Sequence, residues 1–211
     1  MLRPKKLFFV FSVLALLLLT FTRPTRAFDG RSGDNIVIAS DEVIDDNLYV
    51  TAGTFVFDGT VNGDLIAAGR TLTINGKVEG DVMAAGQTVL VNGEVTGAIR
   101  MAGSVLLLDE QASIGGDIIA AGFSLETREG SGIGQDLVFA GSQMLLAGNV
   151  ARNVHAAAGA FELRSTVGGS VNAEVGEANA GYAGPPPSLF MPASPILARA
   201  QDVQISRPGA A

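Results

Sequence analysis

Apolar and polar residues alternate in short runs through residues 33–175, and glycine-containing breaks separate these runs. In the unit at residues 70–86, Leu72 and Ile74 alternate with threonines until Asn75-Gly76 interrupts them. Alternating stretches of three to five residues, bounded by Asn-Gly or Gly-Asp, predict short strands joined by tight turns. Each unit is expected to have three short faces. Glycine is expected at the turns because a positive φ is cheap only for Gly, Asn and Asp.

The unit recurs seven or eight times, at intervals of 16 to 19 residues. A short fixed period is typical of a solenoid, in which each coil buries its apolar edge only against its neighbours. The predicted fold class is therefore all-β, a single-stranded parallel β-helix of seven to eight short coils. Residues 109–111 and 127–131 lengthen their units and are expected to protrude as loops. Each copy closes on an apolar residue, a small residue and a glycine, as in Ala67-Ala68-Gly69, Ala84-Ala85-Gly86, Met101-Ala102-Gly103, Ala120-Ala121-Gly122, Phe139-Ala140-Gly141 and Ala157-Ala158-Gly159.

Alignment of the units places large aliphatic residues in columns that are expected to meet in a shared interior. Each fully buried aliphatic side chain contributes about 1.5–3 kcal/mol, so these columns dominate the predicted stability. One column contains Leu48, Leu65, Val82, Ile99, Ile118, Leu137, Val154 and Val171, and another contains Phe57, Ile74, Val91, Leu108, Leu146 and Leu163.

A further apolar column falls on the outside of the coils if the strands alternate regularly. An apolar stripe on an outer surface needs a cover, which the Pro-rich tail, another chain or a lipid surface could supply. A register shift of one residue would instead turn this column inward and expose Leu65 and Val82. Both interpretations stay open at this point. The residues of the stripe are Ile66, Met83, Ile119 and Val138.

The first 27 residues have the pattern of a signal peptide and are not expected to enter the fold. Residues 1–6 are basic, residues 7–21 are apolar, and Thr25-Arg26-Ala27 offers small residues at a cleavage site. As a helix the apolar run would reach only about 22 Å, less than the roughly 30 Å hydrocarbon core of a bilayer. We expect an exported protein (periplasmic, cell-surface or secreted), with an uncleaved N-terminal membrane anchor as the alternative.

The repeat domain is expected at residues 28–175, after which the composition changes. Residues 176–211 are rich in Ala, Gly and Pro and include Pro185-Pro186-Pro187. This composition is typical of a flexible tail with an extended proline segment. Leu189, Phe190 and Met191 are the candidates within it for binding back to the domain.

Charge and residue usage exclude several classes of function. Without residues 1–27 the chain has 9 Lys and Arg residues against 21 Asp and Glu residues, with no basic cluster. Nucleic-acid binding needs clustered Lys and Arg, so it is not expected. The chain has no cysteine, a single histidine and no glycine motif that opens a helix. We therefore predict no disulfide, no nucleotide or other cofactor, and no nucleophilic or redox catalysis.

Two features are candidates for chemistry. His155 could act as a general base, but it falls in the outward column without a partner carboxylate, which favours an incidental surface histidine. Aspartates recur at one point of successive units, where carboxylates one strand spacing apart could share a calcium ion. The favoured interpretation is structural, with each side chain capping a turn by bonding backbone amides. No catalytic or metal-binding residue is predicted. The aspartates are Asp46, Asp64, Asp81, Asp117 and Asp136.

The repeat of residues 76–86, Gly-Lys-Val-Glu-Gly-Asp-Val-Met-Ala-Ala-Gly, resembles that of the bactofilins, also called polymer-forming cytoskeletal proteins. The likeness covers about residues 44–175. This resemblance implies a right-handed, triangular β-helix whose copies polymerise end to end into non-polar filaments without nucleotide, often at a membrane and in a scaffolding role. The best-known members are cytoplasmic, whereas this chain begins with a signal peptide. An exported or envelope relative is therefore expected.

The leading hypothesis is a non-enzymatic structural protein of the bacterial cell envelope that self-associates through the ends of its β-helix. A solenoid without caps exposes strand edges and an apolar cross-section. The expected partner is the protein itself, with membrane or envelope components as further candidates. The candidate contact residues are Phe161, Leu163, Val167 and Val171, because the sequence shows no cap after their coil.

Two alternatives come from other classes of protein. One is a left-handed hexapeptide-type acyltransferase that would use His155 as its base. The other is an extracellular adhesin or ligand-binding solenoid, which would use the loops near Asp109 and Thr127.

Overall fold

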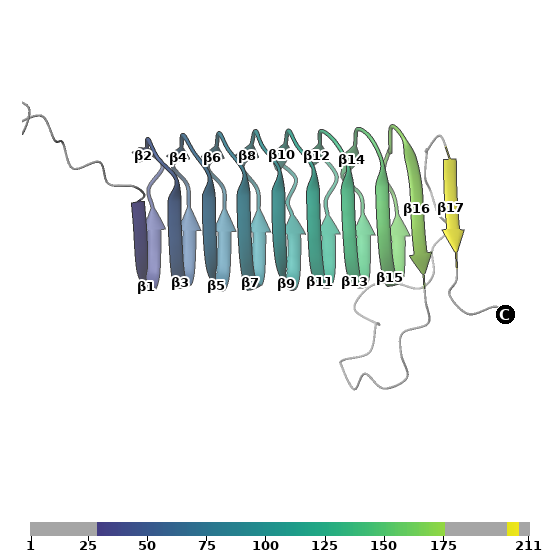
Figure 1. Ribbon diagram of the computed structural model, residues 1–211, viewed down its shortest axis with the longest axis horizontal. Coiled ribbons are helices and arrows are strands. Elements are labelled where there is room, and N and C mark those ends of the chain that lie inside the picture. Colours follow the sequence, from purple (N-terminus) through teal and green to yellow (C-terminus); the bar gives the residue numbers. More distant parts are fainter. Residues whose placement is uncertain (1–28, 176–201, 207–211) are drawn as a thin grey trace, which may run out of the picture.

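The computed structural model describes residues 29–175 and 202–206, which form a solenoid of parallel strands (Figure 1). Each long strand pairs with its counterpart one coil further along the chain. The prediction of an all-β parallel β-helix is confirmed. Within the described ranges there is no helix, and hence none that is long and apolar enough to cross a membrane. The predicted signal peptide at residues 1–27 lies outside the described residues.

Two sheets run along the solenoid. A 7-stranded sheet contains the two-residue strands β2 (Val43–Ile44), β4 (Thr60–Val61), β6 (Lys77–Val78), β8 (Glu94–Val95), β10 (Ser113–Ile114), β12 (Gly132–Ile133) and β14 (Asn149–Val150). A 10-stranded sheet contains the longer strands β1 (Asp29–Ile38), β3 (Leu48–Phe57), β5 (Leu65–Ile74), β7 (Val82–Val91), β9 (Ile99–Leu108), β11 (Ile118–Thr127), β13 (Leu137–Leu146), β15 (Val154–Leu163), β16 (Ser170–Val175) and β17 (Asp202–Ser206).

Each ten-residue strand bends once and supplies two of the faces of its coil, and the two-residue strand supplies another. In β5, Leu65 and Ala67 are buried in the first half, and Leu72 and Ile74 are buried in the second. The inward positions thus change from odd to even residue numbers, and the ladder with β7 skips Arg70 at the bend. The strands are ten residues long rather than the predicted three to five because the ladder resumes directly after this bend.

The buried columns have the register that the sequence predicts. The ladder between β5 and β7 aligns Leu65 with Val82 and Ile74 with Val91, and all four side chains are fully buried. The aligned aliphatic residues form one continuous apolar core along the solenoid. Burial of apolar surface is therefore the main stabilising contribution, as expected for a fold whose coils contact only their neighbours.

The structure has more coils than the seven or eight that the sequence predicts. Nine longer strands follow one another from β1 to β16, before β17 is added. The first and last of these nine lack the closing block of small residues by which the units were counted. Their sequences at that point are Arg31-Ser32-Gly33 and Ala173-Glu174-Val175.

The corner glycines are needed for close packing, and the predicted need for a positive φ is wrong for nearly all of them. Among the described glycines only Gly130 has a positive φ, of 98°. A Cβ added to Gly69 would lie 2.1 Å from the carbonyl oxygen of Ala52, one coil earlier, where real Cβ atoms stay beyond 3.0 Å. Strands about 4.8 Å apart leave room there only for a hydrogen atom.

The loop expected at residues 127–131 is shorter than the sequence suggests. Thr127 is fully buried in a column of aliphatic residues. Its Oγ1 accepts hydrogen bonds from the N–H groups of Ala147 at 3.1 Å and Gly148 at 2.9 Å, which offsets the cost of burying a hydroxyl. Ser131 is also buried, so only residues 128–130 protrude.

Candidate functional site

The N-terminal end of the solenoid presents an open strand edge. In the described part of the chain, β1 lies at the end of the long sheet and pairs only with β3 (Figure 1). Ile38 is fully buried and Ile36 packs partly against the core, whereas Val37 points outward and is 64% exposed. The second half of this edge therefore combines unpaired backbone groups with apolar side chains, which is a template for pairing with another strand.

The first half of the same edge carries a charged group over the interior. Asp29 and Arg31 occupy the columns of Leu48 and Val50, where later coils have aliphatic residues. The Nη2 atom of Arg31 lies 3.1 Å from Asp29 Oδ2 and 2.5 Å from Glu42 Oε1. The hydrogen bond with Asp29, followed by that with Glu42, raises the pKa of Arg31 above its usual range. This ion-pair group gives the N-terminal end one polar half and one apolar half.

Sequence reasoning missed this ion-pair group because the repeat was read from Gly33 onward. Once β3 is aligned with residues 29–38, the two charged residues stand at inward positions. Inward charges on an edge strand are a recognised means of limiting unwanted strand addition. That alignment was the available signal.

The C-terminal end differs from the sequence prediction, because further strands follow the coil of Phe161. Of the four predicted contact residues, only Phe161 is partly exposed; Leu163, Val167 and Val171 are 1–2% exposed. β16, which contains Val171, pairs with β15 and is itself covered by β17. Contacts of this end with another copy would therefore be made by backbone edges and Phe161 rather than by the three buried side chains.

The apolar stripe lies on the outside of the long sheet. The exposed fractions are 51% for Met83, 49% for Ile119 and 38% for Val138, and Ile66 is partly exposed. Leu65 and Val82 are fully buried, which excludes the register in which they would be exposed. The ladders align the stripe with Tyr49 at one end and His155 at the other. Beside it runs a column of exposed small residues: Ala68, Ala85, Ala102, Ala121, Ala140 and Ala157.

Arg100 interrupts the apolar stripe between Met83 and Ile119. Its Nη1 atom lies 3.0 Å from Asp81 Oδ2, and both side chains are nearly half exposed. An exposed pair of this kind contributes little to stability. It does neutralise the charge within the stripe.

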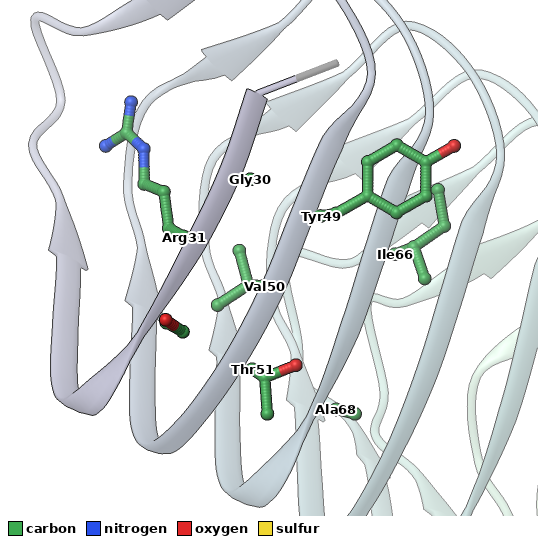
Figure 2. Close-up of a pocket in the computed structure, with 8 residues that line it drawn as sticks. Gly30, Arg31, Tyr49, Val50, Thr51, Ile66 and Ala68 are labelled. Atoms are coloured by element: carbon green, nitrogen blue, oxygen red, sulfur yellow. The ribbon is translucent and has the colours of Figure 1, made fainter. Parts of the chain in front are cut away.

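A shallow hollow of about 320 Å³ lies where the stripe reaches the N-terminal end. Figure 2 shows the Tyr49 ring beside Ile66 on the neighbouring strand, with the Arg31 side chain directed away from both. The charged atoms of Arg31 contact Asp29 and Glu42. The hollow therefore offers an apolar surface and a phenol, without an arranged acid and base. Its lining is Gly30, Arg31, Ser32, Tyr49, Val50, Thr51, Ile66 and Ala68.

The aspartate column forms a ladder of hydrogen bonds to backbone amides. Asp64 Oδ1 accepts from the N–H of Asp81 at 2.8 Å, and Asp136 Oδ1 accepts from that of Asn153 at 2.9 Å. The bonds join successive coils, so the structural interpretation needs one change: each side chain caps the turn of the next coil. Asn47, not Asp46, holds the first position, because its Oδ1 accepts from the N–H of Asp64.

The amide bonds also decide the charge state of this ladder. The N–H of Ala98, followed by the side chain of Arg100, lowers the pKa of Asp81. The N–H of Asn153 is the main cause of the lowered pKa of Asp136. Among residues 29–175 and 202–206, no three His, Asp or Glu side chains converge on a point that could hold a metal ion.

His155 is exposed on β15, in register with Val138 and Asn172. Its position on the outer face agrees with the outward column to which the alternation assigns it. Its ladder neighbours on both sides are uncharged.

Comparison with known proteins gives one match. Residues 36–135 match the family model of the bactofilins, which is described as polymer-forming cytoskeletal. No curated protein and no solved structure matches the chain. The matched segment runs from the second half of β1 to the turn before β13 and thus contains the stacked coils that form the core. Residues 36–135 are therefore a bactofilin domain, which places this chain in the polymer-forming cytoskeletal family.

Proposed function

We propose that this protein is a non-enzymatic scaffold of the bacterial cell envelope whose copies join end to end through the solenoid ends. The bactofilin domain supports a polymer-forming role, since members of that family are polymer-forming cytoskeletal proteins. The observation that carries the proposal is the edge of β1, which pairs on one side only within the described residues.

The backbone of β1 shows which groups would make the contact. The carbonyl of Ile38 accepts a hydrogen bond from the N–H of Asp58 at 3.0 Å, so the backbone groups of Ile38 face β3. In a parallel strand, alternate residues direct their backbone groups to alternate sides. The N–H and C=O of Val37 therefore point away from β3 and are available to a strand of a second copy.

Export and the envelope location rest on the sequence. A basic start, an apolar run and a small-residue cleavage site at residues 1–27 support secretion. Mass spectrometry of the exported protein tests this step, with a mature chain beginning at Phe28 as the expected result. A chain that keeps Met1 and sediments with membranes would support the anchor instead. Contacts with membrane or envelope components stay a prediction.

The acyltransferase alternative depends on a left-handed coil and on His155. We take the coil to be right-handed, as the family resemblance implies, and an experimental structure tests that handedness. His155 stands between the side chains of Val138 and Asn172 in its column, neither of which is a carboxylate. This arrangement gives little support to a general base. The adhesin alternative has no comparable supporting contact.

The proposal is tested by sedimentation velocity and negative-stain electron microscopy of the protein as cells process it. The wild type is expected to assemble as its concentration rises, without nucleotide. Val37→Pro removes the N–H on the open side of β1, where proline is tolerated, and is expected to weaken assembly while leaving the circular dichroism spectrum unchanged. Val37→Ala, which keeps this N–H, is the matched control. A wild type that stays monomeric at high concentration contradicts the proposal.

A further inference from the structure

β17 is an extra strand at the C-terminal end that does not belong to the coil repeat. Its residues pair in parallel with β16, from Ser170 with Asp202 to Glu174 with Ser206 (Figure 1). Val203 lies 32 residues after its partner Val171, whereas Val171 lies 17 residues after its own partner Val154. The two-residue sheet ends at β14, so no short strand accompanies β17. β17 is thus a strand added to the end from a later part of the chain.

The backbone groups that β17 uses are those that a second copy would need. At the first core position of each coil, the N–H points toward the next coil, as from Leu137 to the carbonyl of Asn153 at 2.9 Å. Val171 lies in the column of Leu137. Its N–H and C=O therefore face β17, between the C=O of Asp202 and the N–H of Gln204. While β17 is paired, this edge of β16 is occupied.

With β17 in place the end is also strongly stepped. β16 and β17 continue only the first half of β15, and in the described residues no strand continues its second half, at Ala160–Leu163. Two strand spacings of about 4.8 Å each make this recess roughly 10 Å deep. The edge of β1 spans both halves in one ten-residue strand. An incoming copy could pair with at most the five residues of β17 and would leave Phe161 uncovered.

We propose that the segment Asp202–Ser206 is a removable cap, which competes with an incoming copy for the edge of β16. This inference rests on the end-to-end assembly proposed above and assigns its regulation to the C-terminal strand of the same chain. Release of the cap frees the Val171 edge and halves the depth of the recess. Addition of copies at the C-terminal end then depends on how often β17 leaves, whereas the edge of β1 carries no such strand among the described residues.

Gln204→Pro tests the cap, because it removes the N–H that Gln204 directs at the carbonyl of Val171. Gln204→Ala keeps this N–H and is the matched control. Val203→Pro removes an N–H that points away from β16, so it leaves the cap paired but blocks addition onto its outer edge. In the sedimentation assay, Gln204→Pro is expected to assemble at a several-fold lower concentration than the wild type. Gln204→Ala and Val203→Pro are expected to match the wild type.

Hydrogen exchange of the Val171 and Ala173 amides reports on the cap independently of assembly. Both amides are expected to be protected in the wild type and to exchange faster in Gln204→Pro. Equal exchange in the two proteins, or assembly by the wild type that Gln204→Pro does not promote, would overturn the cap. Loss of assembly in Val203→Pro would make β17 a platform for addition and also overturn it. If every variant stays monomeric while Gln204→Pro still speeds exchange, the assembly proposal fails and the strand pairing stands.

Discussion

Asp64 Oδ1 accepts a hydrogen bond from the backbone N–H of Asp81, one coil further along, at 2.8 Å. Asp81 Oδ1 makes the same contact with the N–H of Ala98, also at 2.8 Å. Each such bond ties two coils together at a turn, where the strand ladders do not reach. The series breaks at Ala98, whose side chain has no oxygen to offer to Asp117, and it resumes from Asp117 to Asp136 at 3.0 Å.

Completion of this ladder is expected to stabilise the protein. Ala98→Asn places an amide oxygen where it can accept from the N–H of Asp117, since Ile99 and Ile118 keep the two coils in register. One hydrogen bond of this kind contributes about 0.5–1.5 kcal/mol. Urea unfolding should show a higher midpoint for Ala98→Asn. Ala98→Val, which adds volume without an acceptor, should not reproduce the gain.

Stability is expected to fall at acidic pH through Asp81 and Asp136. Both have a lowered pKa in the folded protein, so their contribution is complete above the unfolded pKa of about 4 and is lost as the pH falls through the folded pKa. Asp81→Asn and Asp136→Asn keep an oxygen acceptor but do not titrate. The double variant should lose less unfolding free energy between pH 5 and pH 2, measured with urea at each pH. Asp41→Asn, outside the ladder, controls for net charge, and a slope equal to that of the wild type would contradict the prediction.

A methyl group at Gly69 is expected to destabilise the stack. Its Cβ would lie 2.1 Å from the carbonyl oxygen of Ala52, so the coils would have to move apart. Overpacking of this kind costs on the order of 1–3 kcal/mol or more. Gly132→Ala is the matched control, because no atom lies within 4 Å of its added Cβ. Thermal unfolding should show a lower midpoint for Gly69→Ala only, and equal midpoints would exclude close approach as the reason for this glycine.

Neighbouring residues of β7 are expected to respond oppositely to a charge. Met83 is 51% exposed and Val82 is fully buried. Met83→Glu should change the unfolding free energy by no more than about 0.5 kcal/mol, as is usual for surface substitutions. Val82→Glu would bury an unpaired carboxylate in the core and should prevent folding. Circular dichroism with urea unfolding measures both, and an unfolded Met83→Glu protein would contradict the outward assignment of the stripe.

The cross-section of the coil could be predicted because it depends on local alternation. Leu65 and Ile74 recur at a fixed interval with polar residues between them, and only a stacked coil buries all of their counterparts. The same alternation identified the outward position of Met83. The role of Gly69 was assigned to the wrong cause, because a clash with the coil before it leaves no trace in the local sequence.

The ends of the solenoid could not be predicted in this way. Arg31 reads as an isolated charge until the register with β3 places it over the core beside Asp29 and Glu42. The strand at Asp202–Ser206 lies within a segment whose composition predicts a flexible tail, and its partner is a strand edge more than a coil away.

The sequence by itself therefore determined the repeat, the aliphatic columns and the family, because each coil is specified by side chains that lie within one period of one another. Only the tertiary structure decided where the solenoid begins and ends, which groups close it and which edge stays open. Those features depend on pairing between segments that no periodic pattern connects, and the free energy of such pairing comes from backbone groups that every residue shares.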